Sequence, residues 1–368
     1  MSRFFRLDGE GYREKLAGWL RALLEREIVD AVLSPQWTTS GRMVVPTLVR
    51  DPRRLTTPDP VAPVVSVSAA TLAARLTFNQ PQERAAVLLR SCEVRALVEL
   101  EKLEQADLGR LLLVGVDCLG TVKPAAFAEC ASDEEIHQAW WQRGTRGEWP
   151  LETVEPRSAC DICLYPAPGG VDLRLAWIGC PELLVESVSP RGEQAMASLE
   201  LEEVPEPSPR AQLLGQLAAD RRQRRERTLE EFRARHGQVD HLMEMLAPCI
   251  RCYNCRRACP LCYCHECVFE GPIFRHPSQH LHRWAARRGI IEMPTDTLLF
   301  HLTRLNHMGS SCVSCGMCEA ACPSQLPVSL LFAAVGETIQ QIFDYEPGRD
   351  REEELPLATF REEELEPR

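Results

Sequence analysis

The chain has 368 residues, 45% of them hydrophobic and 26% charged, which predicts two or more domains with apolar cores. Its formal net charge of −11 argues against a general nucleic-acid binder, because such proteins usually carry a basic excess. The sequence offers no uncharged apolar run of the about 18 residues that a membrane span requires, and no signal-peptide core near the N-terminus, so we expect a cytoplasmic protein.

Residues 1–200 have the pattern of an α/β domain. An amphipathic helix is predicted within residues 12–28, where apolar side chains follow three-and-four spacing: Leu16, Trp19, Leu20, Leu23 and Leu24. Short apolar runs predict buried strands at residues 28–33, 43–49, 85–90 and 111–116. A helix predicted at 94–105 separates the last two strands. A strand, helix and strand of this length favour a parallel or mixed sheet.

Residues 201–247 differ in composition from the domain before them. The stretch 201–210 is rich in proline and acidic residues, and it predicts a linker. A highly charged helix is predicted to follow and to end at Gly237. Glutamates alternate with its arginines and no aromatic platform accompanies them, so we expect a solvated or domain-bridging helix rather than one that binds nucleic acid.

Residues 248–345 contain most of the seventeen cysteines. Cytosolic thiols stay reduced, so clustered cysteines there favour metal sites over disulfides. Two stretches, CIRCYNCRRACP and CVSCGMCEAACP, both follow the pattern C-x2-C-x2-C-x3-C-P. In bacterial ferredoxins this run holds [4Fe-4S] clusters, and the fourth cysteine of each run ligates the other cluster. Zinc is the alternative, but structural zinc sites usually combine two C-x2-C pairs at a longer separation.

The crossed pairing assigns eight ligands. One cluster takes Cys249, Cys252, Cys255 and Cys322, and the other takes Cys312, Cys315, Cys318 and Cys259. We therefore predict a bacterial-type two-[4Fe-4S] ferredoxin-like domain, with a helical insert between the runs and one-electron transfer as its chemistry. The insert starts with Cys262, Cys264 and Cys267. These three either bind a further metal, with Cys180 or His265 as a fourth ligand, or pack as small buried residues.

A second set of cysteines lies in the α/β domain. Cys92 and Cys118 each follow a predicted strand of the same βαβ unit, and the stretch CDIC adds Cys160 and Cys163. Neighbouring parallel strands place their carboxyl ends at one crevice, where a later C-x2-C pair could complete a four-thiolate site. Cysteines also pack in cores, so spacing alone leaves both interpretations open.

The acidic end, residues 346–368, contains nine acidic residues and four arginines. A segment with so many charges and so few aromatic residues is expected to be extended when no partner is bound to it. It is either a solubilising end or, through the stretch LPLATF at 355–360, a docking segment.

Several of these stretches resemble the β subunit of formate dehydrogenases and hydrogenases that use the deazaflavin coenzyme F-420. They are RSCEVRALVELEKLEQADLGRLLLVGVDCLGT, CDIC, RCYNCRRACPLCYCHEC and LTRLNHMGSSCVSCGMCEAACPSQLPVSLLF, within about residues 85–345. The resemblance implies FAD, which exchanges hydride with the deazaflavin, and one [4Fe-4S] cluster on Cys92, Cys118, Cys160 and Cys163. It also implies partner subunits: a molybdenum or tungsten formate dehydrogenase, a nickel-iron hydrogenase or a heterodisulfide-reductase-like flavoprotein.

The chain departs from this family at its first helix. Relatives carry a Gly-Gly pair there, which lets main-chain amides approach the flavin, whereas this chain reads GEGYREKLAG, and bulky side chains obstruct that approach. The sequence thus predicts an iron-sulfur electron-transfer subunit of a larger anaerobic oxidoreductase complex. The alternative is an FAD-containing subunit that exchanges hydride with a deazaflavin or nicotinamide and splits it into single electrons.

Overall fold

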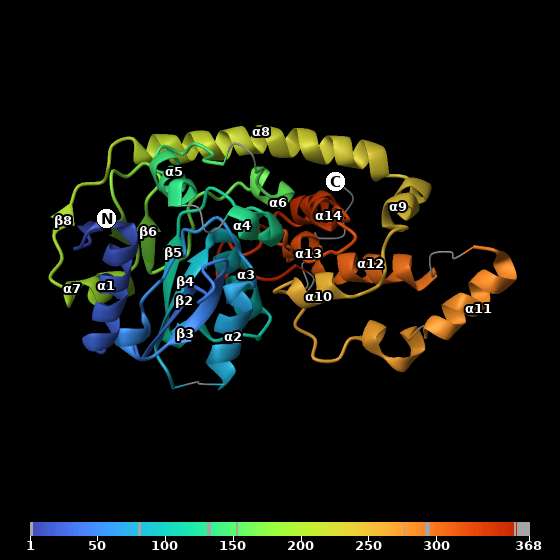
Figure 1. Ribbon diagram of the computed structural model, residues 1–368, viewed down its shortest axis with the longest axis horizontal. Helices are drawn as coiled ribbons and strands as arrows, with labels where there is room; N and C mark the ends of the chain where they lie inside the picture. The colour runs from blue at the N-terminus through green and yellow to red at the C-terminus, as the bar shows by residue number, and fades with distance from the viewer. Residues whose placement is uncertain are drawn as a thin grey trace.

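The computed structural model describes residues 3–79, 82–130, 134–151, 154–275, 277–290, 295–356 and 358. An α/β part and a helical part lie side by side, and the long helix α8 (Arg210–His236) runs along both (Figure 1). Within these residues, no helix is both long and apolar enough to cross a membrane.

Among the described residues, eight strands form one sheet in the order β3-β2-β4-β5-β6-β7-β1-β8. Their bounds are β1 Arg3–Arg6, β2 Ala31–Trp37, β3 Val44–Val49, β4 Ala85–Arg90, β5 Leu111–Val116, β6 Leu173–Ala176, β7 Leu184–Ser187 and β8 Glu203–Val204. The neighbours β2, β4, β5 and β6 pair in parallel, and the outer strands pair antiparallel. The predicted mixed α/β sheet is therefore confirmed.

The two faces of the sheet bury separate apolar cores. Along β4, Ala86 and Leu88 join the core under α1 (Gly11–Glu25), whereas Ala85, Val87 and Leu89 join the core under α2 (Ala69–Asn79) and α3 (Ser91–Lys102). This alternation follows from the two-residue period of a strand. Because helices cover both faces, β4 is buried at every position, and its first five residues are a continuous apolar run.

Shorter helices connect the strands beyond β5. They are α4 (Pro124–Cys130), α5 (Glu134–Gly144), α6 (Ser158–Asp161) and α7 (Pro190–Ala197), with the single turns η1 (Pro52–Arg54) and η2 (Leu108–Arg110) earlier in the chain. The segment that we predicted as a linker contains β8, which pairs with β1 at the edge of the sheet.

The helical part is built around the two cysteine runs. Its elements are α9 (Val239–Leu246), α10 (Asn254–Ala258), η3 (Val268–Glu270), η4 (Pro272–Phe274), α11 (Ser278–Arg288), α12 (Thr295–Met308), α13 (Met317–Ala320) and α14 (Val328–Ile342). Leu305 of α12 and Phe332 of α14 share a core with Leu229 and Phe232 of α8. Helix α11 projects away from the rest of the molecule (Figure 1).

Helix α8 packs against both parts. Near its start, Leu213 and Leu217 contact the apolar core of the α/β part, while its last turns enter the core of the helical part. Toward its C-terminal end, Arg225 and Arg233 both form ion pairs with Glu337 of α14. The interleaved charges of this helix thus serve contacts between the two parts as well as solubility.

Part of the acidic end packs back onto α3. The Arg95 side chain donates to the carbonyl of Pro347 (2.8 Å), and the amide of Gly348 donates to the carboxylate of Glu99 (2.8 Å). An ion pair also joins Arg351 to Glu101. Residues 357 and 359–368, and with them most of the hypothetical docking segment 355–360, lie outside the described residues.

Candidate iron-sulfur sites

Two cavities in the helical part are lined by the cysteines of the two runs. The first cavity is lined by Cys249, Cys252, Cys255 and Cys322. The second cavity is lined by Cys259, Cys312, Cys315 and Cys318. Each cavity takes three cysteines from one run and the fourth cysteine from the other, which is the crossed arrangement.

The backbone turns in the same way in both runs. The residues on either side of the second cysteine have positive φ, with Arg251 at 57° and Tyr253 at 58° in one run, and Ser314 at 54° and Gly316 at 70° in the other. Left-handed conformations cost energy in residues other than glycine, and they persist where the surrounding structure enforces them. The glycine at 316 is also needed for space, because a Cβ there would lie 2.5 Å from the Cβ of Ala159.

A third cavity lies where the sheet meets the helical part. It is lined by Cys92, Cys118, Cys160 and Cys163. Cys92 lies in the first turn of α3, directly after β4, and Cys118 follows β5, so both lie at the carboxyl edge of parallel neighbours. The other two come from α6 and the residues after it, and the Thr121 hydroxyl lies 3.3 Å from the sulfur of Cys160.

The chemistry of these thiols fits a multi-iron group. Burial raises the pKa of Cys255 and of Cys315 to about 11, and it also raises the pKa of Cys92 and Cys318. Thiols in such surroundings ionise when a metal ion supplies compensating positive charge. Among the described residues, no three Cys, His, Asp or Glu side chains are grouped closely enough to hold a single metal ion. Four thiols around each cavity are the ligands that an iron-sulfur cube takes.

The three cavities form a continuous row. The third and second cavities share Ser314 and Cys315 in their linings. The second and first are joined by α10, which carries Cys255 near its start and is followed directly by Cys259. The row begins at the carboxyl edge of the sheet and continues into the ferredoxin-like part.

Arginines that our sequence analysis missed lie beside these thiols. The Arg90 guanidinium donates to the sulfur of Cys118 (3.2 Å), and Arg157 donates to the sulfur of Cys160 (3.6 Å). Burial acts to raise the pKa of Cys160, but Arg157 and Thr121 outweigh burial and lower it. Each of these arginines is two or three residues before a cysteine, which is the signal that could have revealed them. A third, Arg304, lines the second cavity.

The structure does not bring Cys262, Cys264 and Cys267 to a common site. The Cys262 thiol hydrogen-bonds with Cys259, Cys264 is exposed, and Cys267 packs against the apolar cluster that contains Cys255 and Phe269. Of the fourth ligands considered with them, Cys180 lies in a small core of the α/β part, and His265 is exposed. Cys262 and Cys267 thus pack against neighbouring side chains, whereas Cys264 and His265 face solvent.

The start of α1, where the resemblance implies FAD, is filled by side chains. The Tyr12 ring stacks on Trp141 with centroids 4.4 Å apart, and its hydroxyl donates to Asp59 (3.0 Å). Arg13 and the indole N–H of Trp37 donate to the same carboxylate, each at 3.0 Å. These contacts hold the Tyr12 and Arg13 side chains beside the first turn of α1, whereas a Cβ at Gly11 would meet no atom within 4 Å.

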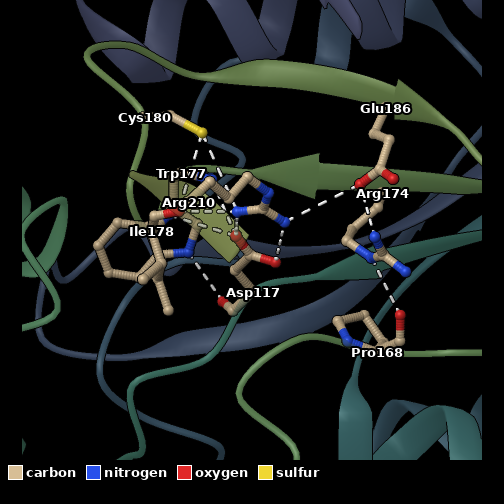
Figure 2. A network of polar contacts seen from close by, with 8 residues as sticks. All are labelled: Asp117, Pro168, Arg174, Trp177, Ile178, Cys180, Glu186 and Arg210. Carbon is tan, nitrogen blue, oxygen red and sulfur yellow. Dashed lines mark hydrogen bonds and ion pairs between the residues drawn. The ribbon is translucent and has the colours of Figure 1, made fainter. Parts of the chain in front are cut away.

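A buried ion pair fixes Asp117, the residue that precedes Cys118 in the sequence (Figure 2). Asp117 accepts hydrogen bonds from Arg210 (3.0 Å) and from the main-chain N–H groups of Trp177 (3.1 Å) and Ile178 (3.2 Å). Arg210 is only 2% exposed and also donates to the Ile178 carbonyl (2.7 Å). Because Arg210 is the first residue of α8, this network fixes that helix to the end of β5.

Replacing Asp117 by Ala is expected to lower the free energy of unfolding by about 3 to 5 kcal/mol, because the buried Arg210 charge then keeps only the more distant carboxylate of Glu186, at 3.9 Å. Urea denaturation under anaerobic conditions measures the change. The control is Glu203→Gln, which removes the exposed ion pair with Arg3 and should leave the unfolding midpoint almost unchanged. Equal midpoints for the two variants would contradict the anchoring role of the buried pair.

Comparisons with known proteins cover both the ferredoxin-type cysteine runs and the chain as a whole. Residues 248–327 match a family model described as 4Fe-4S dicluster domain. Over 361 residues the chain is 25% identical to the F420-dependent formate dehydrogenase subunit beta of Methanocaldococcus jannaschii, covering 89% of each chain. Over 366 residues it is 26% identical to the F420-dependent formate dehydrogenase 1 subunit beta of Methanococcus maripaludis, covering 90% of this chain and 89% of the relative. The resemblance seen in the sequence is thereby confirmed.

A solved structure is also similar. It is a chain of the F420-reducing [NiFe] hydrogenase complex from Methanosarcina barkeri, with a TM-score of 0.48 and 14% sequence identity. The match covers 65% of this chain and 94% of that one.

Proposed function

We propose that the chain is an iron-sulfur electron-transfer subunit of a larger oxidoreductase complex, and that it holds three [4Fe-4S] clusters. The observation that carries the proposal is the row of three cavities, each lined by four cysteines, with Cys315 of the second cavity also reaching the third. When bound, such clusters exchange single electrons at low potential without bond chemistry of their own.

The residues of the chain provide the ligands and the surroundings. The first and second cavities supply the crossed ferredoxin-type ligands, and the third supplies Cys92, Cys118, Cys160 and Cys163. Apolar side chains complete the walls and exclude water, among them Phe300 and Val328 in the first cavity and Leu261 and Phe332 in the second. The buried arginines place positive charge beside the thiolates, which favours their ionised form.

The partners are inferred from the relatives. Both curated relatives are named as formate dehydrogenase β subunits, and the solved structure belongs to a hydrogenase complex. A relay needs a donor and an acceptor, so we infer a catalytic partner of the formate dehydrogenase or hydrogenase kind, or a heterodisulfide-reductase-like flavoprotein. We place this complex in the cytoplasm, where clustered thiols are kept reduced. The side chains at the start of α1 disfavour the alternative in which this subunit itself uses FAD and coenzyme F-420.

The test is the cofactor content of the native complex isolated anaerobically. We expect about twelve iron and about twelve acid-labile sulfide atoms per copy of this chain, as three cubes require, once those of the identified partners are subtracted. We also expect flavin only in amounts that the partners account for. Zinc in place of iron would overturn the proposal. An iron content of about eight atoms per chain would contradict only the third cluster.

A further inference from the structure

A stretch of the ferredoxin-like part stands away from the molecule. It comprises η3, η4 and α11, residues 268–290, and we name it the arm (Figure 1). Helix α11 spans 11 residues, and none of them is buried. Isolated helices shorter than about 12 to 15 residues are marginal in water, and most helices in proteins depend on packing of an apolar face. The helical form of α11 therefore indicates that another surface covers it.

The arm offers an apolar face for such a contact. Leu281, Trp284 and Ala285 follow one another at i, i+3 and i+4 spacing, and Trp284 is 42% exposed. On η4, Ile273 is 84% exposed. Four of the fourteen large hydrophobic side chains that are exposed among the described residues lie on the arm: Val268, Ile273, Trp284 and Ile290. Several exposed apolar residues on one short segment favour an interaction site, whereas single ones do not.

The charge of the arm indicates the chemistry of its partner. The arm contains four arginines and one carboxylate, that of Glu270, which pairs with Arg256 and Arg257, although the whole chain carries a net charge of −11. Arg283 and Arg287 lie four residues apart on α11 and are exposed. A positive patch on an acidic protein attracts a negatively charged surface and fixes its orientation.

The base of the arm packs against residues that line the first cavity. The Arg251 guanidinium donates to the carbonyl of Phe274 on η4 (2.7 Å). Phe269 of η3 packs edge-to-face on Phe300, with centroids 5.1 Å apart, and Phe300 lines the first cavity. In the same wall, Ile250 is 68% exposed and Cys252 is exposed. A protein seated on the arm would thus lie next to the first cavity.

We propose that the arm is the docking site for a redox partner subunit that presents apolar side chains surrounded by acidic residues, with the first cavity facing that partner. This docking site rests on the proposed function. It adds the surface that the partner contacts, and it makes the first cavity the end of the row at which electrons enter or leave. The third cavity, at the opposite end of the row, would then serve the other partner.

The experiment uses the tagged full-length chain expressed in its native host and purified anaerobically with its partners. Arg283→Glu/Arg287→Glu is compared with Arg53→Glu/Arg54→Glu, which reverses two exposed charges on η1 of the α/β part. In parallel, a photo-cross-linking residue replaces Ile273 or, as the matched control, Phe78, an exposed apolar residue of α2. Subunits are quantified by mass spectrometry, and iron and sulfide are counted in the same samples.

We expect the α11 double variant to lose one cofactor-bearing subunit by tenfold or more, with unchanged iron per copy of this chain. Arg283→Lys/Arg287→Lys should retain that subunit, and so should the η1 variant. The cross-link from position 273 should map to an acidic segment of the same subunit, and position 78 should not. Full retention in the α11 variant, or cross-links only to a second copy of this chain, would overturn the docking proposal. Missing iron in every sample would instead overturn the proposed function.

Discussion

The Cys92→Ser variant is expected to contain about eight iron atoms per chain, against about twelve in the wild type, because one cube loses a ligand. Cys92 lies in the third cavity together with cysteines from three other segments of the chain. Serine keeps the size of the side chain but replaces a soft thiolate by a hydroxyl that iron-sulfur clusters bind poorly. Iron and acid-labile sulfide analysis gives the number, and electron paramagnetic resonance of the reduced protein shows which signal disappears.

The control for this variant is Cys180→Ser. Cys180 is also buried in the α/β part, but it packs in a small apolar core, away from the three cavities. Its replacement should leave the iron content unchanged. If Cys92→Ser kept all of its iron, the third set would be a group of packed cysteines, which is the alternative that spacing alone leaves open.

The grouping of the ferredoxin-type cysteines was accessible from the sequence because the information is local. Three of the four cysteines around each cavity lie within seven residues, and the repeated C-P run indicates where the fourth one comes from. The strands β4 and β5 were also predicted with their observed bounds, at 85–90 and 111–116. In the sequence, a strand buried on both faces appears as an apolar run, and turn residues mark its two ends clearly.

The features that were missed depend on long-range contacts. Strands β1 and β8 are short, and Phe4 pairs with Val204, two hundred positions away and inside a proline-rich stretch that has the composition of a linker. Whether a side chain is buried also depends on residues that are distant in the sequence. Arg210 follows prolines and begins a charged helix, yet it is buried against Asp117. The third set of cysteines lies between the local and the long-range features. Cys92 and Cys118 come together only because β4 and β5 are neighbours in the sheet.

Arg304 of α12 provides the second large expected effect. It is 5% exposed and donates one hydrogen bond, to the carbonyl of Cys255 (3.3 Å), while its Nε and Nη1 have no partner in the described structure. Its guanidinium lies 4.8 Å from the ring centroid of Phe332. The groups whose negative charge favours its protonated form are the thiols of Cys255 at the first cavity, of Cys259 and Cys318 at the second, and of Cys262 beside Cys259. Buried donors that lack acceptors are costly, and sulfur atoms of clusters bound in the two cavities would supply further acceptors.

The Arg304→Gln variant is expected to lower the reduction potentials of the first and second clusters, because removal of a nearby positive charge disfavours the added electron. A unit charge about 6 Å away, at an effective dielectric constant of about 20, contributes about 3 kcal/mol, which is on the order of 100 mV for one electron. Potentiometric titration followed by electron paramagnetic resonance measures the shift without any partner subunit. Arg304→Lys should retain much of the wild-type potential, since it keeps the charge.

The matched control for Arg304 is Arg256→Gln on α10. Arg256 is also buried, but Glu270 already neutralises its charge at 2.7 Å, so its loss should change the potentials little. Equal shifts in the two variants would mean that the potentials respond to disturbed packing rather than to charge. A shift confined to one cluster would place Arg304 beside that cluster alone. A shift in both clusters would establish it as a shared counter-ion, whose charge lowers the repulsion when neighbouring cubes are reduced together.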